Sequence, residues 1–297
     1  MAWNLFTAPN LGLLVYKRLY TESSIKNKIK YQPATTNDKE RLFIDIAQNA
    51  KTTPFDLFYK DIFDKTLSDY SQIGNPAANK TFSLSTTYPG LFCGSGYTHD
   101  SNAKGDIKVG FYFDHTTGQP IIPGSSIKGV LKTIFENENE KTDESSLEAW
   151  KFIINKILKC VEDNNKEKWK LLGNDMYIQI LKHLKKSIFG TQDNEGNDVF
   201  FDAVINIQKN GNKKFLANDF ITPHQPNLLK NPIPLMFLKV RPNVVFEFRF
   251  KLTDTEVKTN NKEFTFTADD KLAFFKQIIL TLGLGAKTNV GYGQFTP

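Results

Sequence analysis

The residues best suited to chemistry lie in a glycine-rich segment near the end of the sequence, GLGAKTNVGYG, residues 283–293. Four glycines among these eleven residues allow a backbone that approaches another chain closely and exposes its N–H groups. Such a loop can line a phosphate backbone with donors, place a lysine on a phosphate and stack a tyrosine on a base. The segment therefore predicts an RNA-binding loop. Its candidate contact residues are Gly285, Lys287, Thr288, Asn289 and Tyr292.

Two other structures could account for this segment, a tight turn and a nucleotide-binding P-loop. A tight turn between the last helix and the last strand needs one or two glycines, whereas the segment has four, with Lys-Thr-Asn between them. The glycine count therefore favours a binding function. A nucleotide-binding P-loop is excluded, because that pattern requires glycine directly before the lysine and links a strand to a following helix. Here Ala286 precedes Lys287, and the loop follows a predicted helix.

A second motif, IPGSSIKG, occupies residues 122–129 and opens a predicted helix. Its Pro-Gly pair turns the chain, and either Ser125 or Ser126 is expected to be the N-cap. The N–H groups at such a helix start can bind an anion. Lys128 and Lys132 lie one helical turn apart beside the apolar stripe of the helix, so we expect all four side chains to contact RNA.

A capped amphipathic helix would explain the serines and the apolar residues of this motif without any ligand. It would not explain Gly129, because glycine in a helix interior costs about 1 kcal/mol relative to alanine. We interpret Gly129 as a position where a ligand approaches the helix surface.

Hydrophobic periodicity predicts the elements that position these motifs. Strands are expected at residues 82–86, 107–113, 199–205, 235–240 and 244–252 and at the end of the chain, the first two flanking a long loop as a broad hairpin. Helices are expected after Ser126 and after Thr267. In the second helix Thr267 is the predicted N-cap, Gly283 the C-terminal stop, and the predicted buried stripe is Leu272, Phe275, Ile279 and Leu282.

Without insertions, this order is strand, helix, strand, strand, helix, strand. It is typical of an α+β, ferredoxin-like fold, the fold of RNA-recognition domains. The predicted organisation is a helical N-terminal extension over residues 1–80 and the ferredoxin-like domain over residues 81–297. A basic helical insertion is expected at about residues 141–196.

The composition is that of an ordinary globular protein. The 297 residues are 40% hydrophobic and 24% charged, which excludes disorder over most of the chain. The two cysteines cannot form a disulfide framework or a four-ligand zinc site. With only four histidines, a mixed metal cluster is not expected either, so we predict no metal or cofactor. We find neither a signal peptide nor a membrane-spanning run, and predict a cytoplasmic protein. The net charge of +6 and a pI near 9.0 permit a polyanionic partner.

Together, IPGSSIKG and GLGAKTNVGYG resemble the paired signatures of the RAMP superfamily, the repeat-associated proteins of CRISPR effector complexes. The stretches TTYPGLFCGSGYTH and VFFDAVI resemble a branch found in type III-B (Cmr) complexes. The resemblance spans residues 81–297, and the tail motif is its most specific part. Residues 1–80 and 141–186 carry none of it.

This resemblance implies an RNA-recognition-like fold and a place in an antiviral ribonucleoprotein. The implied partners are guide RNA, target RNA, and the backbone and small subunits of the complex. The implied role is non-catalytic: the subunit caps the backbone filament near the 3′ end of the guide and helps to hold the guide–target duplex.

An enzyme of the same superfamily is the alternative. Some relatives are metal-independent endoribonucleases that process guide RNA with a histidine. Four residues in irregular segments are the candidates: His99, Asp100, His115 and His224. A His-Asp pair in a loop is more often a solvated turn, and a processing enzyme usually carries two tandem folds, whereas one is predicted here. A basic RNA-binding domain outside CRISPR systems is the third interpretation.

Overall fold

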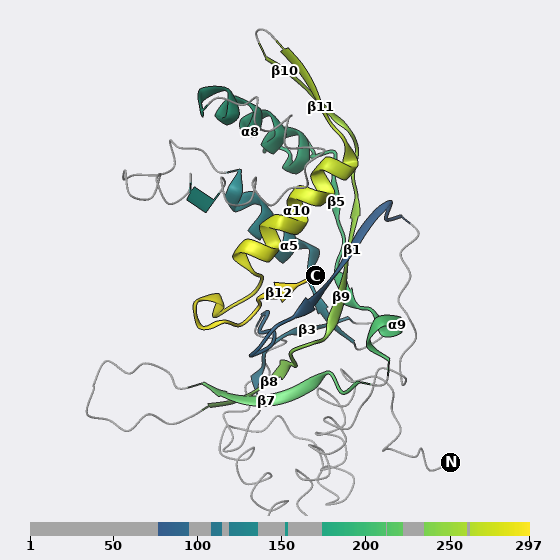
Figure 1. The fold of residues 1–297 in the computed structure, drawn as a ribbon, viewed down its shortest axis with the longest axis vertical. Coiled ribbons are helices and arrows are strands. Elements are labelled where there is room, and N and C mark those ends of the chain that lie inside the picture. Colours follow the sequence, from purple (N-terminus) through teal and green to yellow (C-terminus); the bar gives the residue numbers. More distant parts are fainter. Residues whose placement is uncertain are drawn as a thin grey trace, which may run out of the picture. The chain divides into compact units, whose positions relative to one another are not determined.

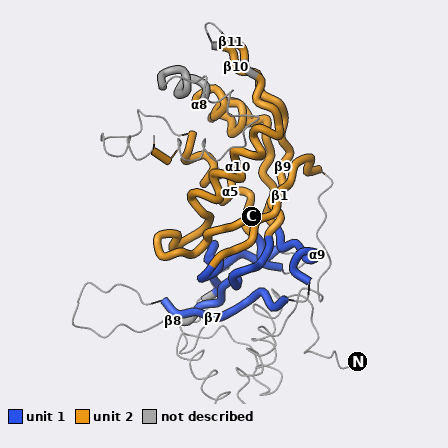
Figure 2. The backbone as a smooth tube through the Cα atoms, in the orientation of Figure 1, with its two compact units in different colours: residues 1–73, 88–121, 204–245 blue, residues 74–87, 122–203, 246–297 orange. Residues whose placement is uncertain are grey.

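The computed structural model describes residues 77–94, 108–114, 119–135, 152–153, 174–211, 213–221, 235–259 and 262–297. The chain divides into two compact units (Figure 2). Unit 1 comprises residues 1–73, 88–121 and 204–245, and unit 2 comprises residues 74–87, 122–203 and 246–297. Nearly all of the predicted N-terminal extension lies outside the described residues, so the predicted domain division stays a prediction.

Unit 2 holds both sequence motifs. Its strands are β1 (Lys80–Thr86), β5 (Val199–Phe200), β9 (Val245–Lys251), the hairpin β10 (Thr255–Thr259) and β11 (Lys262–Phe266), and β12 (Phe295–Thr296). Its helices are α5 (Gly124–Ile134), α8 (Asn174–Phe189), α10 (Ala268–Leu282) and the 3-10 turn η5 (Thr288–Val290). Within unit 2, strand, helix, strand, strand, helix and strand follow one another as β1, α5, β5, β9, α10 and β12. In the sequence, α8 and the β10–β11 hairpin are added to this set, and segments of unit 1 lie between β1 and α5 and between β5 and β9.

The sheet of unit 2 pairs strands that are far apart in sequence. β12 runs antiparallel to β1, β1 is hydrogen-bonded to β9, and β5 runs antiparallel to β9. Asn79 N donates to Phe250 O, and Phe201 N donates to Arg249 O. Successive carbonyls of a strand point to opposite edges, so β1 and β5 flank β9 on opposite sides. The resulting order is β12–β1–β9–β5.

Aromatic side chains fill the space between this sheet and its helices, α5 and α10, which lie on the same side of it (Figure 1). Phe248 and Phe250 alternate along β9 and are fully buried, as the sequence predicted. The Phe250 ring lies 5.7 Å from that of Phe275 on α10. Phe135, which follows α5, contacts Phe274 edge-on at the same distance. These contacts fix both helices against the sheet.

Helix α10 begins and ends where the sequence predicted. Thr267 is the N-cap, and its side chain and that of Asp270 each accept a hydrogen bond from the other's backbone N–H, at 3.2 and 2.9 Å. Gly283 ends the helix with a φ of 74°. The predicted buried stripe was partly wrong: Leu272 and Leu282 are only half-buried. The residues of α10 that are buried are Ala268, Asp270, Lys271, Phe274, Phe275, Ile278 and Ile279. The buried face of α10 is therefore rotated relative to the predicted stripe, and it is the face that packs against β1 and α5.

A buried ion pair joins α10 to the rest of unit 2. Lys271 Nζ lies 2.7 Å from Asp198 Oδ2, and the two side chains are 2% and 0% exposed. The other carboxylate oxygen of Asp198 accepts from the backbone N and the hydroxyl of Thr253 at 2.9 and 3.2 Å. Both charges are thus neutralised and hydrogen-bonded, which a buried pair requires in order to be tolerated.

We predict that Lys271→Met lowers the free energy of unfolding by about 3–5 kcal/mol, because it leaves the Asp198 carboxylate buried without its counter-charge. Adding Asp198→Asn should recover part of this loss, since the amide still offers Thr253 an oxygen and no charge remains. Urea denaturation of the two variants measures the difference. Additive losses in the double variant would show that the pair is not coupled.

Unit 1 contains short strands and a longer hairpin. In the sheet β2–β8–β7, β2 (Lys108–Val109) runs parallel to β8 (Leu235–Val240), and β7 (Leu216–Ile221) runs antiparallel to β8. The strands β6 (Ala203–Ile205), β4 (Pro120–Ile122) and β3 (Tyr112–Phe113) are neighbours in that order, and α9 (Ile207–Asn210) follows β6.

The predicted broad hairpin between residues 82–86 and 107–113 was wrong. The second segment divides at Gly110 into β2 and β3, and β2 pairs with β8. Gly110 donates its N–H to Leu238 O, and its carbonyl accepts from Cys93 N. A Cβ at Gly110 would lie 2.3 Å from the Phe92 ring. The alternation of apolar residues correctly predicted that Val109, Phe111 and Phe113 are buried, but it could not predict that the strand divides at Gly110. No helix in the described part of the chain is long and apolar enough to cross a membrane.

Candidate nucleic-acid interface

The glycine-rich loop of unit 2 connects α10 to β12. All four of its glycines have positive φ: 74° at Gly283, 96° at Gly285, 97° at Gly291 and 67° at Gly293. The loop is closed by a hydrogen bond of 2.8 Å from Leu284 N to Gly293 O, and a Cβ at Gly293 would lie 1.8 Å from Leu284 O. Positive φ favours glycine at all four positions, and the close approach to Leu284 requires it at Gly293. The turn thus accounts for the number of glycines, and the predicted binding role rests on the side chains of the loop.

The tip of this loop presents one cation. Lys287 is exposed, has left-handed backbone angles (φ 59°, ψ 33°) and precedes η5. Its carbonyl accepts from Val290 N at 3.1 Å, so the tip is held by its own backbone. Asn289 and Val290 are exposed and Thr288 is half-buried. The loop tip thus exposes a positive charge (Lys287), an amide (Asn289) and an apolar side chain (Val290) to solvent.

Tyr292 does not match the expectation. The residue is only 9% exposed, so its ring belongs to the packing of the loop. A base could stack on it only if the loop opened. The structure therefore argues against Tyr292 as a stacking platform.

We predict that Lys287→Gly leaves the free energy of unfolding within about 0.5 kcal/mol of wild type, because relief at a left-handed position offsets the added freedom of the unfolded chain. RNA affinity should fall, and its salt slope on a single strand should drop by about 0.7 unit if Lys287 neutralises one phosphate. Fluorescence anisotropy over a salt series measures both. Lys287→Arg is the control and should retain affinity. A loop without a binding role would show the same affinity in all three proteins.

The start of α5 differs from the prediction that a serine caps it. Pro123 is the N-cap and gives no side-chain cap bond, and Ser125 and Ser126 lie within the first turn. The first helical N–H, that of Gly124, donates to Asp202 Oδ1 at 2.7 Å. A carboxylate of the chain itself thus occupies this end of the helix dipole, where it would repel a phosphate. The helix start is therefore not a ready anion site.

The outer surface of α5 keeps part of the predicted site. Ser125, Gly129 and Lys132 are exposed at spacing i, i+4 and i+7, and we call them the α5 strip. Lys128 is half-buried, with its Nζ 5.9 Å from the centroid of the Phe200 ring. A Cβ at Gly129 would meet nothing within 4 Å, so the fold itself does not require glycine there.

We predict that Gly129→Ala raises the free energy of unfolding by about 1 kcal/mol, the difference in helix propensity. If RNA lies against the α5 strip, its affinity should fall in the same variant despite the gain in stability. Thermal unfolding and anisotropy report the two effects. Gln277→Ala, a neutral change on α10 outside the proposed contacts, is the control for binding. An unchanged affinity in Gly129→Ala would remove the strip from the interface.

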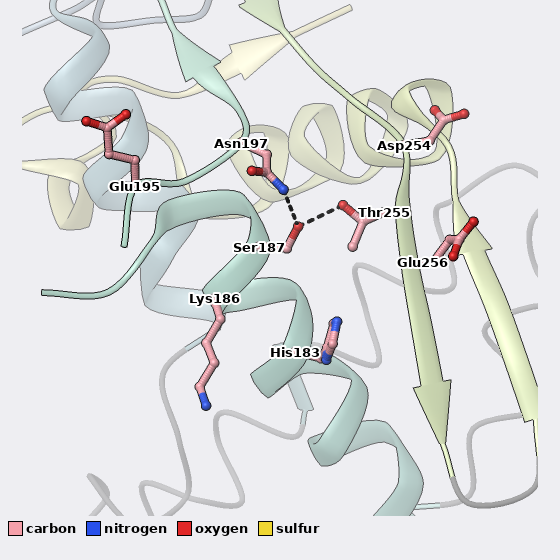
Figure 3. Close-up of a pocket in the computed structure, with 8 residues that line it drawn as sticks. All are labelled: His183, Lys186, Ser187, Glu195, Asn197, Asp254, Thr255 and Glu256. Carbon is pink, nitrogen blue, oxygen red and sulfur yellow. Dashed lines mark hydrogen bonds between the residues drawn. The ribbon is translucent and has the colours of Figure 1, made fainter. Parts of the chain in front are cut away.

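Sequence inspection missed a polar pocket of about 410 Å³ in unit 2. It lies between α8 and the start of β10 (Figure 3), and its lining residues are His183, Lys186, Ser187, Glu195, Asn197, Asp254, Thr255 and Glu256. Ser187 Oγ lies 3.0 Å from Thr255 Oγ1 and accepts from Asn197 Nδ2 at 3.3 Å. These bonds make Ser187 a link between α8 and β10. No local motif could reveal the pocket, because its walls are separated by more than fifty residues in sequence.

The four candidates for an enzymatic role, His99, Asp100, His115 and His224, lie outside the described residues. Among the residues that the structure describes, no group of three or more His, Cys, Asp or Glu side chains could hold a metal ion.

Comparison with known proteins identifies the family. The RAMP superfamily model matches residues 83–296, so the chain belongs to the RAMP superfamily. Within it, the chain is related to the Cmr subunit numbered six. It is 31% identical over 207 residues to the CRISPR system Cmr subunit Cmr6 of Pyrococcus furiosus, which aligns 60% of this chain with 58% of that protein. The alignment therefore spans less than two thirds of the relative.

Two solved structures are also similar to this chain. A chain in the cryo-EM structure of the type III-B Cmr-beta complex bound to cognate target RNA matches at 20% identity and a TM-score of 0.41, covering 99% of this chain and 90% of that one. The crystal structure of Cmr6 from Pyrococcus furiosus matches at 26% identity and a TM-score of 0.36, covering 60% and 83%.

Proposed function

We propose that this protein is a guide-RNA-binding subunit of a type III-B CRISPR effector complex, acting as Cmr6 does in its own complex. The observation that carries the proposal is the 31% identity to Cmr6 over 207 residues, within a superfamily match that spans residues 83–296. The subunit caps the filament of backbone subunits near the 3′ end of the guide RNA and helps to hold the guide–target duplex. Its partners are therefore RNA and the other Cmr subunits.

The topology of unit 2 supports a ferredoxin-like fold. The six core elements follow the strand–helix–strand–strand–helix–strand order, and the sheet order β12–β1–β9–β5 places the fourth and third strands on either side of the first. Both helices contact each other and leave the other face of the sheet without them. RNA-recognition domains use this architecture.

The exposed groups of unit 2 suit contact with an RNA backbone. Lys287 and Lys132 provide charge, and Asn289 and Ser125 provide hydrogen-bonding groups. Recognition of this kind is independent of base sequence and weakens with salt. A subunit that must accept many different guides requires that property.

A non-catalytic role fits the described part of the chain. The serine in the polar pocket, Ser187, shares a hydrogen bond with Thr255 and accepts one from Asn197. The alternative, a guide-processing endoribonuclease, predicts site-specific cleavage of a repeat-containing precursor RNA without divalent metal. Incubating the purified protein with that RNA separates the two functions, and such cleavage would overturn the proposal.

Reconstitution tests the role in assembly. We expect the full chain to join the other type III-B subunits only when guide RNA is present. A guide carrying a photocrosslinking base in its 3′ segment should crosslink to this chain, and one carrying it near the 5′ end should not. Exclusive crosslinking at the 5′ end, or failure of the chain to enter the complex, would contradict the proposed position.

A further inference from the structure

Unit 1 contains a surface groove of about 820 Å³ that neither sequence motif touches. It lies where β7 begins and β8 ends, beside the turn that follows β8. The residues that line it are Tyr88, Pro89, Lys213, Lys214, Ala217, Asn218, Lys239, Arg241, Pro242 and Asn243. We call this the unit 1 groove.

The lining of the unit 1 groove is strongly basic. Four of its ten residues are cationic and none is acidic. Lys213 and Lys214 are exposed, whereas Lys239 is 8% exposed and forms an ion pair with Asp219. Arg241 is half-buried, and its Nε donates to Leu216 O. The groove thus combines two exposed lysines with two cations held by contacts of the fold, and this excess of positive charge favours an anionic ligand.

An aromatic ring stands at this groove. Tyr88 is 85% exposed. The segment that carries it is fixed on β8, because Leu91 N donates to Val240 O at 3.0 Å and Val240 N donates to Leu91 O at 3.2 Å. Gly90 has a φ of 118°, and a Cβ there would lie 2.2 Å from Val240 O. The backbone beside Tyr88 is therefore held in place, while the ring is left in solvent.

Covering the exposed face of an aromatic ring with a ligand is favourable, because it removes apolar surface from water. Aromatic rings beside cations are the recurring platform for single-stranded nucleic acid. The exposed amides of Asn218 and Asn243 add groups that can bond to bases or riboses. A membrane surface or an acidic protein segment would use the lysines but would not require a flat aromatic face.

We propose that the unit 1 groove binds a single-stranded segment of RNA, with Lys213, Lys214 and Arg241 on phosphates and Tyr88 stacked on a base. This inference deepens the proposed function, and rests on it, by adding a second RNA contact in the other unit of the chain.

Salt-dependent binding tests the phosphate contacts. The probe is a fluorescein-labelled twelve-nucleotide oligouridylate, and the protein is the full chain. In Lys213→Ala/Lys214→Ala the slope of log affinity against log salt should fall by about 1.4 units, because each phosphate contact on a single strand contributes about 0.7. The matched control is Lys182→Ala/Lys251→Ala, which removes the same charge from two exposed lysines of unit 2 and should retain the slope.

A comparison of base and abasic probes tests the stacking contact. Tyr88→Ala should weaken binding of the oligouridylate by about tenfold, within the range expected for one stacked base, and leave the salt slope unchanged. Tyr88→Phe keeps the ring and should bind as wild type does. An abasic ribose-phosphate oligomer of equal length should bind wild type and Tyr88→Ala equally.

The outcomes separate the groove from the proposed function. If wild type binds RNA and both groove variants match their controls, the groove is not an RNA site, while the proposed function stands. If wild type binds no RNA either alone or in the reconstituted complex, both fail. If the lysine variant binds RNA normally but no longer enters the complex, the groove belongs to a protein partner and this inference is overturned.

Discussion

The buried pair of Lys271 and Asp198 is the interaction on which unit 2 depends. The Asp198 carboxylate, just before β5, binds Lys271 Nζ in the first turn of α10. It also accepts hydrogen bonds from the backbone N–H and the hydroxyl of Thr253, in the segment that follows β9. A carboxylate with a 0% exposed side chain is tolerated only when it is paired and hydrogen-bonded, and here its partners come from two other segments of the chain.

From that constraint the position of the candidate loop follows. Helix α10 is capped at one end by Thr267 and Asp270 and stopped at the other by Gly283. The loop that follows is closed by the bond between Leu284 and Gly293, and it ends in β12, which pairs with β1. Lys287 is thus held by a chain of backbone contacts that does not involve its own side chain. A rigid backbone of this kind removes the cost of ordering the loop when a phosphate binds, so that only the lysine side chain loses freedom.

The candidate RNA contacts of both units share one chemistry. The loop tip, the α5 strip and the unit 1 groove offer lysines, amides and one exposed ring. None of these groups needs a particular base sequence, because phosphates are uniform and every base has a face on which a ring can stack. This is suitable for a subunit of an RNA-guided complex, in which base pairing of the guide supplies the sequence specificity.

Local patterns in the sequence determined the features that arise from near neighbours. The alternation along residues 244–252 gave the buried strand β9, and the Thr267 cap and Gly283 stop gave the limits of α10, because strand period and capping depend on residues a few positions apart. The two signatures, together with the match over residues 83–296, gave the family.

Tertiary structure decided the rest. It alone revealed that Asp202 occupies the start of α5, that Tyr292 is buried and that Tyr88 shares a groove with Lys213 and Arg241. Each of these depends on contacts between segments distant in sequence, where burial and charge are set by partners that no local pattern encodes. The four glycines of the loop show the same limit: their number was visible in the sequence, but only the structure showed that each has a positive φ.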